Sequence, residues 1–468
     1  MTDYKHLAQA DKNHVLHPFT VLKDYAEGQT GDPRIVTSGQ GIRIRDQNGT
    51  ELIDAFAGLY CVNIGYGRQE VAEAIYEQAK KLAYAHIYAQ QSNEPLIRLS
   101  ERLCKMAPAN MERVYYGMSG SDANETQAKL VWYYHNVLGK PEKKKIIARE
   151  RGYHGSSVIS GSMTGLPLYH TLFDQPVRPI LHTGSPHYYW NAEQGESEQD
   201  FSKRRAKELE DMILAEGPET VGAFIAEPVL GTGGITPPPE GYWEAIQPIL
   251  KKYDILLIAD EVITGFGRTG EMFGSAKYGI EPDLITVAKG LTSAYVPLSG
   301  AIVSKKVSDV LKQGSDKAGM FSHGYTYSGH PLGAAAANAV LDIVEQEDLP
   351  GRARDIGGYF QKRLRETFSQ HPLVGEVRGV GLMAAIEFVA DRDAKERFDP
   401  DLKVGARVSM AALAEGMIAR AMPHGDILGF SPPLIISEAD VDLVIDKARK
   451  AVDKVTDELT RDNLWKAA

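Results

Sequence analysis

The sequence predicts an α/β fold, with a mainly parallel sheet in a large domain and a smaller α+β domain. The first observation is a series of short apolar runs, separated by helical or turn-rich stretches: RVYYG at 113, KKIIARE at 144, TVGAFIAEPV at 220, DILLIADEV at 254 and DLITVAKG at 283. Buried strands that alternate with helices are typical of a parallel sheet covered on both faces. The second observation is the C-terminal part, where long helical patterns surround one strand-like run, GLMAAIEFV at 381.

The N-terminal part begins with an expected β-hairpin at residues 41–56. Apolar and polar residues alternate on both sides of Asn48-Gly49, a dipeptide that tolerates the positive φ angles of a tight turn. From about residue 69 the period changes, and two segments carry apolar residues at spacings of three and four: EVAEAIYEQAKKLAYA and EPLIRLSERLCKMA. This spacing predicts two amphipathic helices before the first buried strand.

The C-terminal part predicts three helices and a strand. One helix begins at about Pro331, another covers about 352–369, and the last opens at Ser437-x-x-Asp440, which is the pattern of a capping box. Because the N-terminal hairpin is also antiparallel, we expect it to join this part. The expected domains are therefore residues 67–333 for the large domain, with 1–66 and 334–468 forming one discontinuous small domain.

Composition excludes several classes of protein. The net charge of -10 argues against nucleic acid or an anionic membrane as a partner. Two cysteines without a C-x-x-C pattern, and no H-E-x-x-H, predict neither a disulfide framework nor a metal site. The sequence has no run of about 18 apolar residues, the length that a helix needs to span a bilayer, and the N-terminus is too polar for a signal peptide. We expect a cytoplasmic protein.

Three features at the ends of expected strands are candidate functional sites. Gly117–Asp122 is a small-residue turn between a strand and a helix, where free N–H groups and the helix dipole would cradle a phosphate; ordinary helix capping is the alternative. Asp260 ends a very apolar strand, where a buried carboxylate needs a partner. Lys289 ends another such strand, where burial would lower its pKa and make it a usable nucleophile or base; a solvated surface lysine is the alternative.

A literal G-x-G-x-x-G pattern also occurs, at Gly265–Gly270. In a dinucleotide site these glycines lie directly between a strand and a helix, whereas here Asp260-Glu261 already interrupts the strand and the following EMFGSAKYG has poor helical periodicity. An NAD-dependent oxidoreductase is therefore the alternative enzyme class.

A phosphate cradle, a buried carboxylate and a desolvated lysine are together the groups that hold pyridoxal phosphate. At these residues the sequence resembles the class III (subgroup II) aminotransferases of PLP fold type I, in particular the ω-amine:pyruvate members. The resemblance extends over nearly the whole chain, through these motifs: HPFT at 17, AGLYCVNIGYG at 57, GSDANE at 120, RGYHG at 151, AEPV at 226, DEVITGFGRTG at 260, AKG at 288 and HGYTYSGHP at 323.

The resemblance implies roles for the cofactor-binding residues. Lys289 would form the internal aldimine and move the proton between substrate and cofactor carbons, and Asp260 would pair with the pyridine nitrogen. Tyr153 would stack on the ring opposite Val262, with Glu227 supporting the Tyr153 side. The phosphate would be bound by Gly120, Ser121 and Thr326, and Tyr325 would bind the cofactor beside Thr326. Because family members supply Thr326 from the partner subunit, the resemblance implies a homodimer, and it leaves tetramers open.

The resemblance also implies a substrate pocket. Arg420 matches a mobile arginine that grips a substrate carboxylate. Phe19, Tyr60 and Tyr88 match positions on the amine side, and Thr232 lies in a turn that approaches this pocket. Many ω-amine members have tryptophan where this chain has Tyr60, so the size of the pocket is open.

The implied activity is transfer of an amino group, by a ping-pong mechanism, from an amine or ω-amino acid to pyruvate or a similar keto acid. A decarboxylase, aminomutase or racemase of the same fold would keep Lys289 and Asp260, so these residues do not exclude one. A regulator of this fold would need an added DNA-binding domain, for which the chain has no spare length. Because residues from both ends and the middle of the chain serve one site, we expect a single catalytic unit.

Overall fold

The computed structural model describes residues 2–108 and 110–466. A seven-stranded sheet forms its centre, and the strands follow one another across the sheet in this order: β4 (Met111–Gly117), β10 (Ser299–Ser304), β9 (Leu284–Val287), β8 (Leu256–Asp260), β7 (Val221–Ala226), β5 (Lys145–Arg149) and β6 (Ile180–Thr183). β10 runs antiparallel to both of its neighbours, and the pairs from β9 to β6 are parallel. The predicted mixed and mainly parallel sheet is confirmed.

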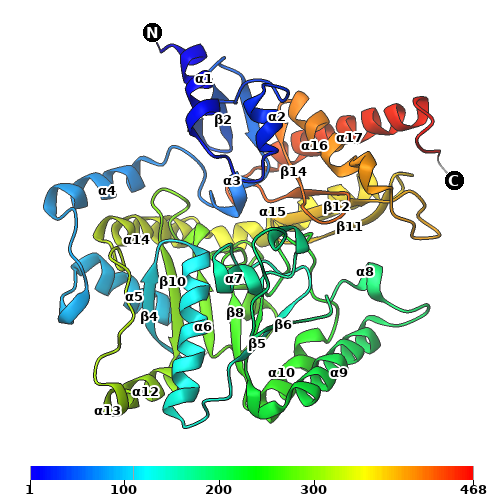
Figure 1. The fold of residues 1–468 in the computed structure, drawn as a ribbon. Coiled ribbons are helices and arrows are strands. Elements are labelled where there is room, and N and C mark those ends of the chain that lie inside the picture. Colours follow the sequence, from blue (N-terminus) through cyan, green and yellow to red (C-terminus); the bar gives the residue numbers. More distant parts are fainter. Residues whose placement is uncertain (1, 109, 467–468) are drawn as a thin grey trace.

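Both faces of this sheet are buried, and consecutive residues pack on opposite sides. Ile146, Ile225 and Ile258 pack with α6 (Gly120–Val137) and α12 (Lys305–Gln313). Their chain neighbours pack on the other face with α9 (Glu198–Glu216) and α10 (Tyr242–Lys252). This double burial explains why the strands appear in the sequence as continuous apolar runs. In Figure 1 the helices lie on either side of the central sheet.

The two ends of the chain form a second, smaller assembly. The hairpin β2 (Arg43–Asp46) and β3 (Glu51–Asp54) turns at Gly49, which has φ +77°. β3 also pairs in parallel with β13 (Met417–Ile418), in a four-stranded sheet that β1 (Val36–Gln40) completes. The N-terminal and C-terminal elements accordingly lie side by side in Figure 1.

A second four-stranded sheet of this assembly comes entirely from the C-terminal part. Its strands follow the order β11 (Val374–Val380), β12 (Met383–Phe388), β15 (Ile427–Phe430) and β14 (Arg420–Ala421). Three helices pack with it: α15 (Leu349–Phe368), α16 (Val404–Ala414) and α17 (Glu438–Arg461). The predicted capping box is present at the start of α17, where Ser437 and Asp440 bond reciprocally.

One long helix contributes to the cores of both assemblies. α14 (Pro331–Gln346) packs Ala334 and Ala337 against the large sheet and α5 (Glu94–Met106), whereas Val340 and Val344 belong to the core of the small assembly. The remaining α-helices are α1 (Tyr4–His14), α2 (Leu22–Ala26), α3 (Ala57–Tyr60), α4 (Gln69–Lys81), α7 (Val158–Met163), α8 (Tyr188–Asn191), α11 (Gly274–Lys277) and α13 (Ser315–Ala318). The pairing of β3 with β13 supports a discontinuous small domain, and its boundaries at 66 and 333 stay a prediction.

Every helix in the described ranges is too short or too polar to cross a membrane.

Candidate active site

Several strand ends and the N-terminus of α6 surround one cavity. Seven of the predicted site residues line it: Gly120, Ser121, Tyr153, Glu227, Asp260, Val262 and Lys289. Four further residues complete the lining: Asn124, His154, Gly155 and Ile263. Strands that run in parallel end at the same edge of a sheet, which brings Asp260 of β8 and Lys289 after β9 together.

Lys289 begins a short turn directly after β9. Its backbone has φ +43°, a left-handed conformation that costs a non-glycine residue about 1–3 kcal/mol and is concentrated at functional sites. The amine lies 5.3 Å from the centre of the Tyr60 ring. Burial lowers the pKa of Lys289, which increases the fraction of neutral, nucleophilic amine.

Asp260 is buried, and each of its carboxylate oxygens has a donor. Oδ2 faces Asn124 Nδ2 at 2.9 Å and His154 Nδ1 at 2.8 Å, while Oδ1 accepts from the backbone N–H of Val262 at 3.1 Å. Charge-assisted bonds of this kind stabilise a buried carboxylate. Val262 lies in the turn that follows the end of β8 and lines the cavity.

The contacts of Asn124 and His154 with Asp260 were not predicted from the sequence. Asn124 is held in turn by Thr286, whose hydroxyl donates to Oδ1 at 2.7 Å, and by the carbonyl of His154 at 2.7 Å. One signal was available, because Asn124 lies four residues after Gly120 and such residues share a helix face. His154 is the neighbour of Tyr153 in the RGYHG motif, and its ring nitrogen faces Asp260.

The N-terminus of α6 forms an anion cradle. Ser119 caps the helix in a capping box with Asp122. A Cβ atom added to Gly120 would lie 3.1 Å from a methyl group of Val262, and one on Gly155 would lie 2.7 Å from Ser121 Oγ, so both glycines leave room at this point. Free N–H groups and the positive helix end at this position fit a phosphate group.

Tyr153 and Glu227 form the opposite wall. Glu227 is buried and accepts from the backbone N–H groups of Tyr153 at 3.0 Å and Gly231 at 2.7 Å. Burial raises the pKa of its carboxyl group. The Tyr153 ring packs on Tyr169, with 5.2 Å between centroids, and Phe19 also packs on Tyr169 at the same distance.

Tyr60, Thr232 and Arg420 come from three distant parts of the chain to the side of this cavity. The buried Tyr60 donates its hydroxyl to the carbonyl of Gly231 at 3.3 Å, and Thr232 is the next residue of that turn. Arg420 is half-buried, with its guanidinium 5.7 Å from the ring centre of Phe56. Among the described residues, no carboxylate forms an ion pair with Arg420.

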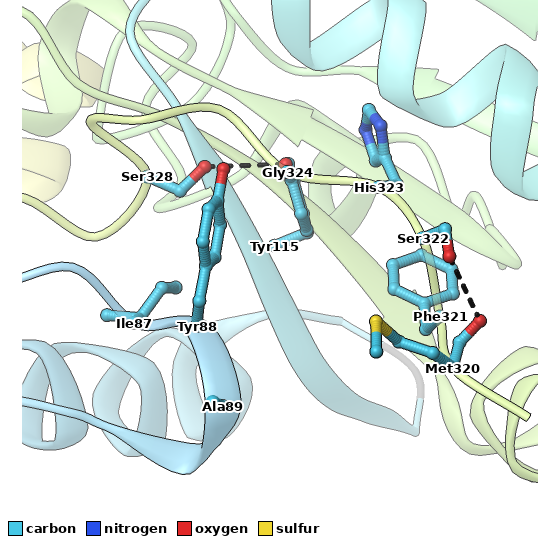
Figure 2. Close-up of a pocket in the computed structure, with 10 residues that line it drawn as sticks. All are labelled: Ile87, Tyr88, Ala89, Tyr115, Met320, Phe321, Ser322, His323, Gly324 and Ser328. Carbon is cyan, nitrogen blue, oxygen red and sulfur yellow. Dashed lines mark hydrogen bonds between the residues drawn. The ribbon is translucent and has the colours of Figure 1, made fainter.

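Tyr88, Tyr325 and Thr326 lie elsewhere in the single chain. Tyr88 lines a separate cavity of about 500 Å³ together with residues 87, 89, 115, 320–324 and 328. Figure 2 shows these side chains. The Tyr325 hydroxyl faces α6 through Thr126 at 3.5 Å, and Thr326 is exposed. One chain therefore does not bring these three residues into the lining of the Lys289 cavity.

The G-x-G-x-x-G segment has no dinucleotide geometry. Its glycines lie in turns, with φ +99° at Gly267 and +93° at Gly270, and the helix that follows, α11, has four residues. Glu261 accepts from the backbone N–H groups of Gly274 and Ser275 at the start of α11.

Comparison with known proteins agrees with this geometry. Residues 25–452 match the family of class-III aminotransferases. An uncharacterized aminotransferase of Sinorhizobium fredii is 69% identical over 460 residues, which cover 98% of each chain. A diaminobutyrate–2-oxoglutarate transaminase of Halomonas elongata is 58% identical over 470 residues and the full length of both chains.

The fold comparison gives the same family. The ω-transaminase of Pseudomonas jessenii, solved in complex with PMP, superimposes with a TM-score of 0.94 at 44% identity, over 97% of this chain and 99% of that one. Class-III aminotransferases use pyridoxal phosphate, and the lysine, the buried carboxylate and the anion cradle of this cavity fit that cofactor. The chain therefore belongs to the class-III aminotransferases, PLP-dependent enzymes of fold type I.

Proposed function

We propose that this aminotransferase moves an amino group from an amine or ω-amino acid to pyruvate or a similar keto acid by a ping-pong mechanism. One observation carries the acceptor class: Arg420 is half-buried beside the cavity and has no carboxylate partner among the described residues. A guanidinium in this state is available to bind a substrate carboxylate through two parallel hydrogen bonds.

The residues of the cavity divide the work. When bound, pyridoxal phosphate supplies a carbonyl carbon for the amino group and a ring that withdraws electrons. Lys289, with its neutral amine, would hold the cofactor and would carry the proton. Asp260, fixed by Asn124 and His154, would place a negative charge at the ring nitrogen, and Gly120 and Ser121 at the start of α6 would bind the phosphate.

A second acceptor deserves a direct comparison, because the Halomonas relative is named for 2-oxoglutarate. 2-Oxoglutarate carries two carboxylates and would need two cations in the substrate pocket, whereas Arg420 supplies a single cation. We therefore expect pyruvate to be used better than 2-oxoglutarate. Measuring both acceptors against 1-phenylethylamine and against diaminobutyrate, with amino-acid product as the readout, compares the two candidates directly.

Arg420→Ala tests the role of the guanidinium. A hydrogen-bonded charge contributes about 1.5–3 kcal/mol, so we expect kcat/KM for pyruvate to fall roughly 10- to 150-fold. The half-reaction with 1-phenylethylamine, which has no carboxylate, would change little. For Arg420→Lys, which keeps the positive charge but lacks the planar guanidinium, kcat/KM for pyruvate would lie between the values of the wild type and Arg420→Ala. Equal losses in both half-reactions would contradict a carboxylate site at Arg420.

We also propose a homodimer whose two active sites each use residues of both chains. Two observations support it: Thr326 and Tyr88 lie away from the Lys289 cavity of their own chain, and the segment near them exposes apolar side chains such as Met320 and Phe321. Exposed apolar patches of this kind mark contact sites between proteins.

Complementation tests this arrangement. Lys289→Ala and Thr326→Asp would each inactivate a homodimer, but co-expressed they form mixed dimers in which one of the two sites has both residues intact. We expect activity to reappear in the purified mixed dimer. If each site belonged to one chain, the mixed dimer would stay inactive.

A further inference from the structure

A buried cluster of charges lies where the small assembly meets the large sheet, outside the cavity described above. Arg378 of β11 is almost fully buried, and its Nη1 lies 2.6 Å from Glu376 Oε2 and 2.5 Å from Glu387 Oε2. His187, Glu376 and Glu387 have ligand atoms within 4.8 Å of one another, as metal ligands do. The Arg378 guanidinium already takes both carboxylates, so the cluster is an ion-pair network.

The same guanidinium also holds a turn of the large domain. Nε donates to the carbonyls of Gly234 at 3.0 Å and Ile235 at 3.2 Å, and Nη2 donates to Gly234 at 2.6 Å. This turn, residues 231–235, follows β7 and carries Thr232. One side chain therefore connects the β11 sheet to the turn beside the substrate pocket.

The turn needs such a connection because its backbone is strained. Ile235 has φ +51°, which is unfavourable for a β-branched residue, and its side chain is fully buried. Such a conformation persists when the surroundings impose it. Arg378 bonds the carbonyl of this residue and of its neighbour. The turn also packs against the backbone of Arg151, which a Cβ on Gly233 would approach to 2.0 Å.

The opposite end of the turn touches the active site. The N–H of Gly231 donates to Glu227, and its carbonyl accepts from Tyr60. A Cβ atom on Gly231 would lie 2.3 Å from Ile263, another residue of the cavity lining, so the turn has no free space to shift. This end of the turn is held by Glu227 and Tyr60, through contacts that do not involve Arg378.

The sheet that carries Arg378 also carries Arg420. β11 pairs with β12, β12 with β15, and β15 with β14, where Arg420 lies opposite Gly429. The contact between Arg378 and the turn therefore sets where the Arg420 strand lies relative to Thr232.

We propose that Arg378 is a positioning residue for the keto acid: it fixes the turn at 231–235 against the β11–β14 sheet and thereby sets the spacing between Thr232 and the Arg420 guanidinium. This inference rests on the proposed function, in which Arg420 binds the substrate carboxylate.

Arg378→Lys tests the inference in the holoenzyme. A lysine keeps a positive charge beside Glu376 and Glu387, but its single ammonium group cannot hold both carboxylates and both carbonyls. We expect KM for pyruvate to rise at least tenfold. The amine half-reaction with 1-phenylethylamine would change less than threefold, and the visible absorbance of the bound cofactor would be unchanged.

Arg397→Lys is a control for losing a guanidinium beside Glu387: Arg397 lies 3.7 Å from this carboxylate, its side chain is 46% exposed, and it forms no bond to the turn among the described residues. It should leave both half-reactions unchanged. If Arg378→Lys does not fold, Arg378→Gln combined with Glu387→Gln removes one charge of each sign, and the same rise in KM is expected.

An unchanged KM for pyruvate in the soluble Arg378 variant, or equal losses in both half-reactions, would overturn the positioning role. An inactive wild-type enzyme would instead refute the proposed function, so the two failures are distinguishable.

Discussion

Asn124 supports the carboxylate of Asp260, and replacing it with alanine should slow the reaction without releasing the cofactor. The amide holds Asp260 at 2.9 Å and is itself held by Thr286 and the carbonyl of His154. In Asn124→Ala the carboxylate keeps His154 and the Val262 N–H, and it loses the donor that comes from α6.

The size of the effect follows from this one bond. A hydrogen bond to a charged group is worth about 1.5–3 kcal/mol, and about 1.4 kcal/mol corresponds to a tenfold change in rate. If this bond is needed to keep Asp260 in place during the reaction, kcat should fall roughly 10- to 150-fold. Gly120, Ser121 and Lys289 are untouched, so cofactor content should stay near that of the wild type.

Gln127→Ala provides a matched control. Gln127 is one turn further along α6, is equally buried, and donates to the carbonyl of Ile285, the residue before Thr286. Both variants leave buried polar groups unpaired, so both should lower the free energy of unfolding by about 1–3 kcal/mol.

The assay measures kcat with 1-phenylethylamine and pyruvate, cofactor content by visible absorbance, and stability by urea unfolding. When kcat is expressed per bound cofactor, it should fall in Asn124→Ala and stay at the wild-type value in Gln127→Ala. Equal values of kcat in the two variants would refute the assignment of Asn124 to Asp260.

Three further outcomes are expected. After treatment with pyridoxal phosphate and borohydride, the mass of the wild type should increase by one cofactor per chain, whereas the mass of Lys289→Ala should not change. An increase in the variant would show that another lysine binds the cofactor. Asp260→Asn should lower kcat by orders of magnitude with cofactor still bound, and full activity would remove Asp260 from the mechanism. Because burial lowers the pKa of Lys289, capture of pyridoxal phosphate by the apoenzyme should accelerate as pH rises, with a midpoint below the ordinary value of about 10.4; a midpoint at or above that value would contradict the burial of this amine.

The large sheet was predictable because strands buried on both faces leave continuous apolar runs in the sequence. β6 and β10 left no such signal: β6 has four residues with a histidine among them, and β10 includes Gly300 and two serines. The antiparallel direction of β10 depends on its pairing with β4 and β9, which no local pattern encodes.

The site was predictable in part for the same reason. Lys289 and Asp260 end apolar strands, so their position at one sheet edge follows from parallel topology. The bonds of Asn124 and His154 to Asp260 join residues more than 100 positions apart. The spacing from Gly120 places Asn124 on the helix face of the site, but only the side-chain geometry shows that both residues bind Asp260. The hydrogen bond from Arg378 to Gly234 was also not predictable, because neither residue belongs to a recognisable motif.

The parallel pairing of Ile53 with Met417 has a consequence for biosynthesis. β3 leaves the ribosome about 360 residues before its partner β13 exists. At roughly 5–20 residues per second, this edge of the hairpin waits on the order of 20–70 s without its neighbour. During that time the large sheet can form, but the strand edge beyond β3 stays open to other nascent chains. Loss of the last 60 residues should therefore leave a protein whose N-terminal hairpin stays exposed and aggregates.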